Sequence, residues 1–247
     1  MRLVVVIPTY NEADNLGRLV TSLFALPLDL RLLVVDDNSP DGTGRVADEL
    51  AAKYPGRIQV LHRAGKLGFS TAYLQGFQAA LLGGAEAVVQ IDADLSHDPS
   101  VLPAMVDRLQ NCDVVLGSRY VPGGSVDERW SFWRKGLSTW ANFYARTILG
   151  IPARDVTGGY RLWRREALER MPLDRIQANG YVFQVEMLYL AYCMGCRFGE
   201  VPIYFADRRW GKSKMSFKIQ IEAAFRVWQV LWSYRDLHRT RDTARSA

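Results

Sequence analysis

The chain has 247 residues, of which 49% are hydrophobic and 23% are charged, and its formal net charge is +5. This is the composition of an ordinary soluble protein. The chain is also long enough to bury a full hydrophobic core, which excludes a small protein that depends on disulfides or metals for its stability. The modest basic excess favours anionic partners, such as phosphates, lipid headgroups or nucleic acid, without selecting one of them.

Three features of the sequence bear on the compartment. Met1 to Tyr10 lacks the long apolar region and the cleavage site of a signal peptide, so we expect a cytoplasmic chain. The longest uncharged stretch, Phe69 to Ala85, is too short and too polar for a membrane-spanning helix. Cys193 and Cys196 form one CxxC pair without a second pair, which favours two small apolar residues in a reducing compartment over a zinc site.

The first half of the chain alternates strand and helix patterns. Apolar, β-branched runs predict strands at Arg2–Pro8, Leu30–Asp37, Arg57–Arg63 and Ala85–Asp92. Helical spacing and terminal Gly or Pro residues predict helices at Glu12–Leu26, Asp41–Pro55 and Gly68–Gly84. We therefore expect a single Rossmann-like α/β domain, with a mostly parallel central sheet and helices on both faces.

Polar residues follow each of these four strands. Ligands of parallel α/β sheets bind beyond the carboxyl ends of the strands. The residues at those ends are Tyr10, Asn11, Glu12, Asp36, Asp37, Lys66, Asp92 and Asp94. Helix capping explains single residues such as Asp41 or Asp98. It does not explain why Asp92 and Asp94, both upstream of the helix that starts near Pro99, are acids.

Asp92 and Asp94 carry the strongest chemical signal. In an extended backbone their side chains point to the same side, with Ala93 opposite. Two carboxylates at this spacing repel each other unless a cation lies between them or one is protonated. Mg²⁺ is typically bound by one or two carboxylates together with substrate phosphates. The pair therefore predicts a site for Mg²⁺ or Mn²⁺ and a diphosphate.

The same motif leaves an alternative open. Aspartyl phosphotransferases of the haloacid dehalogenase type use DxDx[ST], which Asp92, Asp94 and Ser96 match, and Asp92 would then be a nucleophile. Their motif normally opens the catalytic domain, whereas here three strand and helix units precede it. This difference favours the diphosphate interpretation.

Several ordered motifs resemble a known family. "VVVIPTYNE", "LLVVDDNSPDGT", "GKLG", "IDADLSHDP" and "GSRY" are similar to those of glycosyltransferase family 2, which uses nucleotide-sugar donors. "WRKGLSTWAN", "DVTGGYRLWRREAL", "GYVFQVEML" and "DRRWGKSKM" extend the resemblance to dolichyl-phosphate and polyprenyl-phosphate mannosyltransferase catalytic subunits, from Arg2 to about Lys218. The resemblance implies a GT-A type fold and metal-dependent transfer of mannose from GDP-mannose to a polyprenyl monophosphate. Direct attack by that acceptor predicts inversion.

The resemblance also implies roles for individual residues. The nucleoside positions are Pro8, Tyr10, Glu12, Val35 and Asp37, with Lys66 at the same nucleotide-sugar site. The diphosphate and metal positions are Asp92, Ala93 and Asp94, and Ser96 stays open as a third ligand because some members carry Gln there. Basic positions that contact the acceptor phosphate are Arg119, Arg134, Arg208 and Lys214, of which Arg119, Arg208 and Lys214 also serve the donor.

The residue types agree with this chemistry. A lipid monophosphate carries close to two negative charges and needs cationic positioning rather than a strong general base. Arginine forks suit phosphate oxygens. Transfer to a glycan hydroxyl would need a base, and we see no compelling acid in "GGYRLWRREAL". Transfer of another sugar, such as glucose from a UDP-sugar, stays open because the donor rests on the resemblance alone. All four predicted strands are followed by the polar residues that a catalytic site would need. This disfavours a protein that only binds a ligand and does not catalyse a reaction.

The last part of the sequence predicts a membrane-interfacial segment. We divide the chain into a catalytic domain at 1–215, an amphipathic helix at 216–236 and a basic, disordered tail at 237–247. The broad apolar face of the helix comprises Phe217, Ile221, Phe225, Trp228, Leu231 and Trp232. Packing of this face on the core is the alternative, and it is slightly favoured for the first half of the helix. Trp228, Trp232 and Tyr234, followed by arginines, are typical of an interface with anionic lipid. We expect peripheral association with the cytoplasmic face of a membrane, directly or through a separate membrane-spanning partner.

An aromatic and basic segment, residues 128–149, predicts a loop through Trp133 followed by a helix that covers a lipid-phosphate entrance or packs on the core. Aromatic residues interleaved with basic ones also occur in nucleic-acid binding. No RNA-binding motif accompanies them, and the acidic DxD would repel phosphates without a metal. We therefore expect no nucleic-acid partner.

Overall fold

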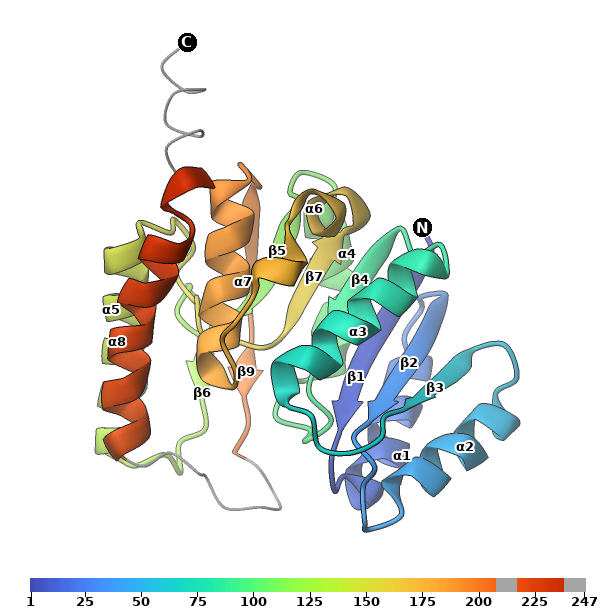
Figure 1. Cartoon of the computed structure of the whole chain (residues 1–247). Helices are drawn as coiled ribbons and strands as arrows, with labels where there is room; N and C mark the ends of the chain where they lie inside the picture. The colour runs from blue at the N-terminus through green and yellow to red at the C-terminus, as the bar shows by residue number, and fades with distance from the viewer. Residues whose placement is uncertain (208–216, 238–247) are drawn as a thin grey trace.

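A seven-stranded sheet forms the centre of the protein, whose computed structural model describes residues 1–207 and 217–237 (Figure 1). The strand order is β3-β2-β1-β4-β7-β5-β8, and a separate two-stranded sheet pairs β6 with β9. Within the large sheet β7 is antiparallel to both neighbours, and the other paired strands are parallel. The predicted mostly parallel α/β fold is confirmed.

The elements of the first half lie where the sequence predicts them, with ends that differ by a few residues. The strands are β1 (Leu3–Thr9), β2 (Leu30–Asp36), β3 (Ile58–His62), β4 (Ala87–Gln90), β5 (Val114–Ser118), β6 (Ser125–Val126), β7 (Arg161–Arg164), β8 (Phe198–Pro202) and β9 (Tyr204–Phe205). The helices are α1 (Ala13–Phe24), α2 (Thr43–Lys53), α3 (Phe69–Leu82), α4 (Leu102–Leu109), α5 (Phe132–Leu149), α6 (Arg165–Arg170), α7 (Tyr181–Cys193) and α8 (Phe217–Ser233). Two 3₁₀ turns are η1 (Pro99–Val101) and η2 (Leu173–Arg175).

The two faces of the sheet bury separate hydrophobic clusters. In β1, Val5 and Ile7 pack with α1 and α4 on one face, whereas Val4 and Val6 pack with α3 and α7 on the other. The strand reads as a continuous apolar run because successive side chains point to opposite faces and both faces are covered. Helices α5 and α8 lie side by side as an outer layer against α7 (Figure 1).

Helix α3 approaches the sheet unusually closely at Gly76. A Cβ atom built on Gly76 would collide with Val6 Cγ1 and lie 3.3 Å from Val35 Cγ2. Glycine therefore allows α3 to lie directly on β1 and β2, and this approach brings α3 side chains to the carboxyl ends of the strands.

Helix α5 begins earlier than the sequence predicts. The expected loop through Trp133 is wrong, because Phe132 and Trp133 already belong to the helix. The hydroxyl of Ser131 accepts a hydrogen bond of 3.3 Å from the backbone N–H of Arg134, which is the usual way in which serine starts a helix.

Helix α8 has apolar side chains on two sides. Val227, Val230 and Tyr234 are buried against the protein, whereas Phe225, Trp228 and Trp232 are exposed. The prediction that Tyr234 lies at an interface is wrong: its hydroxyl donates a hydrogen bond of 3.0 Å to Glu186 Oε1 in the interior. The side chains of Phe217 and Ile221, and residues 238–247 of the predicted tail, lie outside the described part of the chain. No described helix is long and apolar enough to cross a membrane.

Two glycine substitutions test how closely the helices pack. Gly76→Ala should lower the free energy of unfolding by about 1–3 kcal/mol because the new methyl group overpacks the β1 contact. Gly17→Ala in α1, where nothing lies within 4 Å of the new Cβ atom, should instead raise the free energy by up to about 1 kcal/mol through helix propensity. Urea unfolding followed by circular dichroism measures both. Equal effects of the two substitutions would contradict the close packing of α3.

Candidate functional site

The loops at the carboxyl ends of β1, β2 and β4 share a strained backbone. Asn11, Asn38 and Leu95 have φ angles of 62°, 54° and 59°, and each follows one of these strands. For residues other than glycine the left-handed region is unfavourable by roughly 1–2 kcal/mol, less for asparagine. Such strain concentrates at functional sites, and here it marks the edge of the sheet to which the sequence assigns ligand binding.

The predicted nucleoside residues line the first part of this edge. Lys66 Nζ lies 3.9 Å from the ring centroid of Tyr10, which joins the loops after β1 and β3. Glu12 Oε2 accepts a hydrogen bond of 2.8 Å from Asn15 Nδ2. Pro8 and Val35 are neighbours in the β1–β2 register, and the side chain of Val35 is fully buried in the core.

Asp37 forms a buried ion pair that sequence reasoning missed. Its Oδ1 accepts a hydrogen bond of 2.6 Å from Arg63 Nη1, and Arg63 Nη2 donates to Thr71 Oγ1 in α3 at 2.6 Å. Burial raises the pKa of Asp37 above its ordinary value even though Arg63 opposes the shift. The only sequence signal was an arginine at the end of a predicted strand.

The DxD motif lies in a turn beyond the strand. The sequence predicts that Asp92 and Asp94 lie on an extended strand end. This prediction is wrong, because strand β4 ends at Gln90. Ala93 is nevertheless buried, whereas both acids are partly exposed. Asp94 Oδ1 accepts a hydrogen bond of 3.0 Å from the backbone N–H of Ser96. Asp98 caps η1 through the N–H of Ser100, which confirms that it is a helix-start residue.

A tyrosine that the sequence did not single out holds Asp92 from below. The hydroxyl of Tyr73, in α3, donates a hydrogen bond of 2.8 Å to Asp92 Oδ1. Burial, together with the charges of Asp92 and Asp94, raises the pKa of Tyr73 well above its ordinary value. The hydroxyl therefore keeps its proton and donates the hydrogen bond. In the sequence, Tyr73 looks like any apolar residue on the buried face of a helix.

The carboxylates of the DxD turn fit part of the ligand set of a metal ion. The described residues contain no group of three or more His, Cys, Asp or Glu side chains that could hold a metal. Asp92 and Asp94 supply two carboxylates, and Mg²⁺ commonly completes such a set with water and substrate phosphates. Ser96 is buried, and its hydroxyl has no hydrogen-bond partner among the described residues, so its part in metal binding stays a prediction.

Arg119 is anchored in the interior rather than extended into solvent. Its Nε and Nη2 donate hydrogen bonds of 2.8 Å to the two carboxylate oxygens of Asp155, and Nη2 also donates to Thr157. Burial alone would raise the pKa of Asp155, but the charge and hydrogen bonds of Arg119 outweigh it, so that this pKa lies below its ordinary value. Asp155 and Thr157 belong to the "DVTGGY" motif, whose partners the sequence could not identify.

Arg134 is connected to Arg119 through two aromatic rings, those of Trp130 and Phe205. Arg134 Nη1 donates a hydrogen bond of 2.9 Å to Asp207 Oδ1, and its guanidinium lies 3.8 Å from the ring centroid of Trp130. The ring of Phe205 contacts the rings of Trp130 and His97 and the guanidinium of Arg119, and so joins this region to the turn. The predicted phosphate ligands Arg208 and Lys214 lie outside the described residues.

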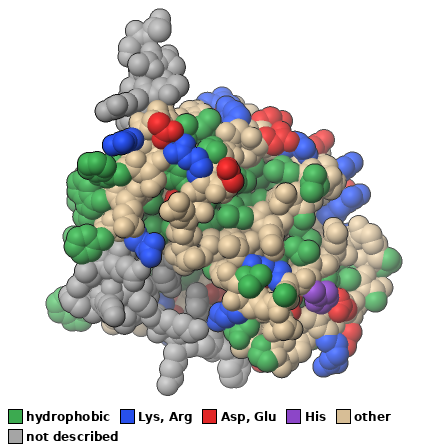
Figure 2. Space-filling view, in the orientation of Figure 1, with side chains coloured by type: hydrophobic (Ala, Val, Ile, Leu, Met, Phe, Trp, Pro, Cys, Tyr) green, Lys and Arg blue, Asp and Glu red, His purple; other side chains and the backbone are tan. Residues whose placement is uncertain are grey.

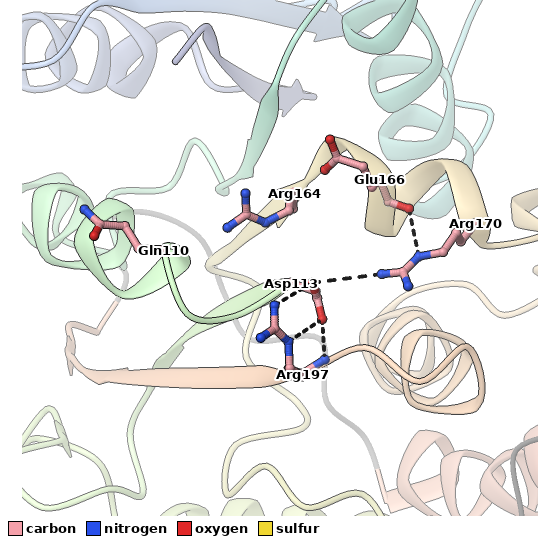
Figure 3. Close-up of a pocket in the computed structure, with 6 residues that line it drawn as sticks. All are labelled: Gln110, Asp113, Arg164, Glu166, Arg170 and Arg197. Carbon is pink, nitrogen blue, oxygen red and sulfur yellow. Dashed lines mark hydrogen bonds and ion pairs between the residues drawn. The ribbon is translucent and has the colours of Figure 1, made fainter. Parts of the chain in front are cut away.

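A charged cleft lies on the side of the sheet opposite to the DxD turn, before the amino ends of β5 and β8 (Figure 3). The backbone N–H and Nε of Arg197 donate to Asp113 Oδ2 at 2.8 and 3.2 Å, and Arg170 lies 4.0 Å from Asp113 Oδ1. Arg164 donates to backbone carbonyl groups instead. Because these arginines bind acceptors within the protein, we interpret the cleft as a structural contact that connects β5, α6 and β8.

Comparison with known proteins identifies the family. The model for "Glycosyl transferase family 2" matches residues 4–171. The chain is 44% identical to polyprenol monophosphomannose synthase of Mycolicibacterium smegmatis over 246 residues, which cover 99% of this chain and 92% of that protein. It is 43% identical to undecaprenyl-phosphate mannosyltransferase of Micrococcus luteus over 227 residues, which cover 92% of this chain and 93% of that protein.

Two solved structures share the fold at lower identity. S. aureus TarS in complex with UDP-GlcNAc gives a TM-score of 0.63 at 17% identity, over 94% of this chain and 66% of that one. Mannosyltransferase PcManGT from Pyrobaculum calidifontis, in complex with GDP-Man and Mn²⁺, gives 0.59 at 21% identity, over 100% and 75%. The fold and the family match together make this chain a GT-A type glycosyltransferase. The chain belongs to glycosyl transferase family 2.

The buried Arg119–Asp155 pair should dominate the stability of this region. Asp155→Ala should lower the free energy of unfolding by about 3–5 kcal/mol because it leaves the Arg119 charge buried without its partner. Since the pKa of Asp155 is lowered in the folded protein, its contribution is fully present above the ordinary value of 3.8 and is lost as the pH falls below it. Urea unfolding at pH 7 and at decreasing pH measures the effect.

The exposed pair Arg175–Asp236 provides the control. Because solvent screens both partners, Asp236→Ala should change the free energy of unfolding little. A loss at Asp155 no larger than the loss at Asp236 would contradict the importance of the buried pair.

Proposed function

We propose that this chain transfers mannose from GDP-mannose to a polyprenyl (dolichyl-type) monophosphate, with a divalent metal and with inversion, to give polyprenyl-phosphate mannose and GDP. Two relatives that are 43–44% identical over nearly the whole chain carry names that include this acceptor class and mannose. The fold neighbour that binds GDP-Man and Mn²⁺ is more distant and supports only the architecture.

The state of the carboxylates around Arg119 and Arg134 supports a phosphate acceptor. Asp155 accepts two hydrogen bonds from Arg119, and Asp127 accepts hydrogen bonds from both the side chain and the backbone of Arg129. These contacts hold the pKa of Asp155 and of Asp127 below the ordinary range. Neither carboxylate is a good general base for a sugar hydroxyl. A lipid phosphate, which is already ionised near neutral pH, needs no such base.

The donor end combines the nucleoside loops with the DxD turn. Pro8, Tyr10, Glu12, Asp37 and Lys66 would surround the nucleoside, and Asp92, Ala93 and Asp94 would meet the diphosphate. The side chain of Val35 is buried in the core, so this predicted position could offer only its backbone. A divalent cation bound there would stabilise the negative charge that develops on the departing diphosphate. Asp92 is fixed by Tyr73 and Asp94 by Ser96, so both acids keep their positions before the donor arrives.

The acceptor end relies on positive charge. Arg119 and Arg134, with Arg208 and Lys214, would bring the lipid phosphate up to the anomeric carbon. Direct attack by a phosphate oxygen breaks the bond between the sugar and the diphosphate and inverts the anomeric centre. Arg134 is suited to exchange Asp207 for a phosphate, because this pair is only partly buried and solvent-screened pairs are weak.

Exposed aromatic residues on α5 and α8 support contact with a membrane. Figure 2 shows hydrophobic side chains gathered on the side of the molecule that these helices occupy in Figure 1. The membrane patch comprises Trp140 and Phe143 of α5 and Phe225, Trp228 and Trp232 of α8. Aromatic side chains favour the interface between water and lipid. We propose that this patch, to which an interfacial helix at 216–236 contributes three residues, holds the catalytic domain on the cytoplasmic face of a membrane.

A transfer assay tests the proposed reaction. The protein is incubated with polyprenyl phosphate, Mg²⁺ or Mn²⁺, and labelled GDP-mannose or UDP-glucose, and label extracted into organic solvent is counted. We expect label from GDP-mannose, and at least a 100-fold lower rate for Asp94→Asn because one metal ligand loses its charge. The melting temperature of this variant should change little, since Asp94 is partly exposed.

Two outcomes would correct the proposal differently. No lipid-extractable label from either donor would overturn polyprenyl-phosphate glycosyl transfer. Label from UDP-glucose alone would replace only the donor, and full activity of Asp94→Asn would remove the metal argument.

Substitutions in the membrane patch test its role. Phe225→Ser and Trp232→Ser should each weaken binding to vesicles that contain anionic lipid by about tenfold, because each removes an exposed apolar group worth roughly 1.5–3 kcal/mol on full burial. Leu82→Ser serves as the control because Leu82, at the end of α3, is exposed but lies outside the patch. Co-sedimentation with vesicles measures binding. Equal losses in all three variants, or none in any, would favour recruitment by a membrane-spanning partner.

A further inference from the structure

We infer that Tyr73 is a positioning residue for the donor site, which acts by holding the carboxylate of Asp92 in one orientation. This inference rests on the proposed function, in which Asp92 binds the metal and the diphosphate. Tyr73 itself is fully buried and lies beneath the rim, so it acts through Asp92 and does not touch the substrate.

The aromatic packing of α3 and α7 fixes the tyrosine ring. Phe183 stacks on the ring at a centroid distance of 6.0 Å and an interplanar angle of 12°. Phe69 meets it edge to face at 5.0 Å, and Phe77 lies 5.7 Å away. The hydroxyl therefore presents its proton from one direction, and the 2.8 Å hydrogen bond fixes Asp92 Oδ1 at that point.

The other oxygen of Asp92 is confined by a glycine backbone. A Cβ atom on Gly159 would lie 3.2 Å from Asp92 Oδ2 and 3.4 Å from Gln184 Nε2. Gln184 is itself held by Gln90, whose Nε2 donates to Gln184 Oε1 at 2.7 Å. Asp92 is thus enclosed by a donor on one side and by a close backbone on the other.

The same helix also supports the nucleoside end, which makes the effect separable. Thr71 of α3 accepts a hydrogen bond from Arg63, the partner of Asp37, whereas Tyr73 reaches Asp92. Loss of the Tyr73 hydroxyl leaves the Arg63–Asp37 contacts unchanged. It should therefore weaken binding of the metal and diphosphate without weakening the contacts of the nucleoside.

Tyr73→Phe tests this role through metal binding rather than activity. Mn²⁺ is titrated into the full chain in the presence of GDP, and free Mn²⁺ is measured by electron paramagnetic resonance. We expect about tenfold weaker Mn²⁺ binding, the lower end of the 10–100-fold range typical when a partner of a metal ligand is removed. The affinity for GDP in the presence of EDTA should match that of the wild type.

Tyr234→Phe is the matched control. It also removes a buried hydrogen bond between a tyrosine and a carboxylate, that of Tyr234 with Glu186, but far along the chain from the DxD turn. We expect a fall in melting temperature similar to that of Tyr73→Phe and Mn²⁺ binding equal to that of the wild type. Similar Mn²⁺ affinities in the two variants would overturn the inference, since the role of Tyr73 would then be structural alone.

A second variant approaches the same carboxylate from the other side. Gly159→Ala keeps Tyr73 but places a methyl group against Asp92 Oδ2, and it should also weaken Mn²⁺ binding. Wild-type Mn²⁺ affinity in folded Gly159→Ala would contradict the confinement of Asp92, even if Tyr73→Phe did not fold. Absence of Mn²⁺ binding by the wild type, or binding that survives Asp94→Asn, would instead overturn the proposed metal site and this inference with it.

Discussion

The acids at the carboxyl edge of the sheet are compensated from inside the protein, and the organisation of the site depends on this constraint. Asp37 pairs with Arg63, Asp92 accepts a hydrogen bond from Tyr73, and Asp155 binds Arg119. Carboxylates that are partly or fully buried without donors would be strongly unfavourable, and they would also repel one another and any anionic ligand. Hydrogen-bond donors from inside the protein therefore allow several acids to surround a site that is proposed to bind a diphosphate and a lipid phosphate.

The donors come from core elements, which transfers the rigidity of the core to the site. Helix α3 supplies the Tyr73 hydroxyl and also Thr71, which orients Arg63. The helix can do both because Gly76 lets it lie directly on β1 and β2. Protein interiors are packed as densely as organic crystals, so that side chains locked in them hold their partners in place. The packing of one helix therefore influences both the proposed nucleoside end and the proposed diphosphate end of the site.

The sequence was informative wherever the signal is local. Strand and helix periods, and the polar residues at strand ends, depend on neighbours in the chain, and they located the sheet edge and the DxD motif. Tyr73, Arg63 and Asp155 were missed because their meaning comes from partners brought near by folding, 19 residues away for Tyr73 and 36 for Asp155. Tyr234 was misread for the same reason, since an amphipathic pattern cannot distinguish a core contact with Glu186 from a lipid contact.

The two ends of the site differ in how firmly their arginines are held. Arg63 and Arg119 are buried with their carboxylates, and breaking such pairs is unfavourable by about 3–5 kcal/mol. Arg134 and Asp207 are both partly exposed, and a pair of this kind contributes about 0–1 kcal/mol. On the proposed function, Arg63 at the donor end and Arg119 are therefore set before binding, whereas Arg134 can leave Asp207 for a lipid phosphate at little cost. On the same proposal, an acceptor arginine that can change its partner, beside a fixed donor site, suits an enzyme whose second substrate would enter from a membrane.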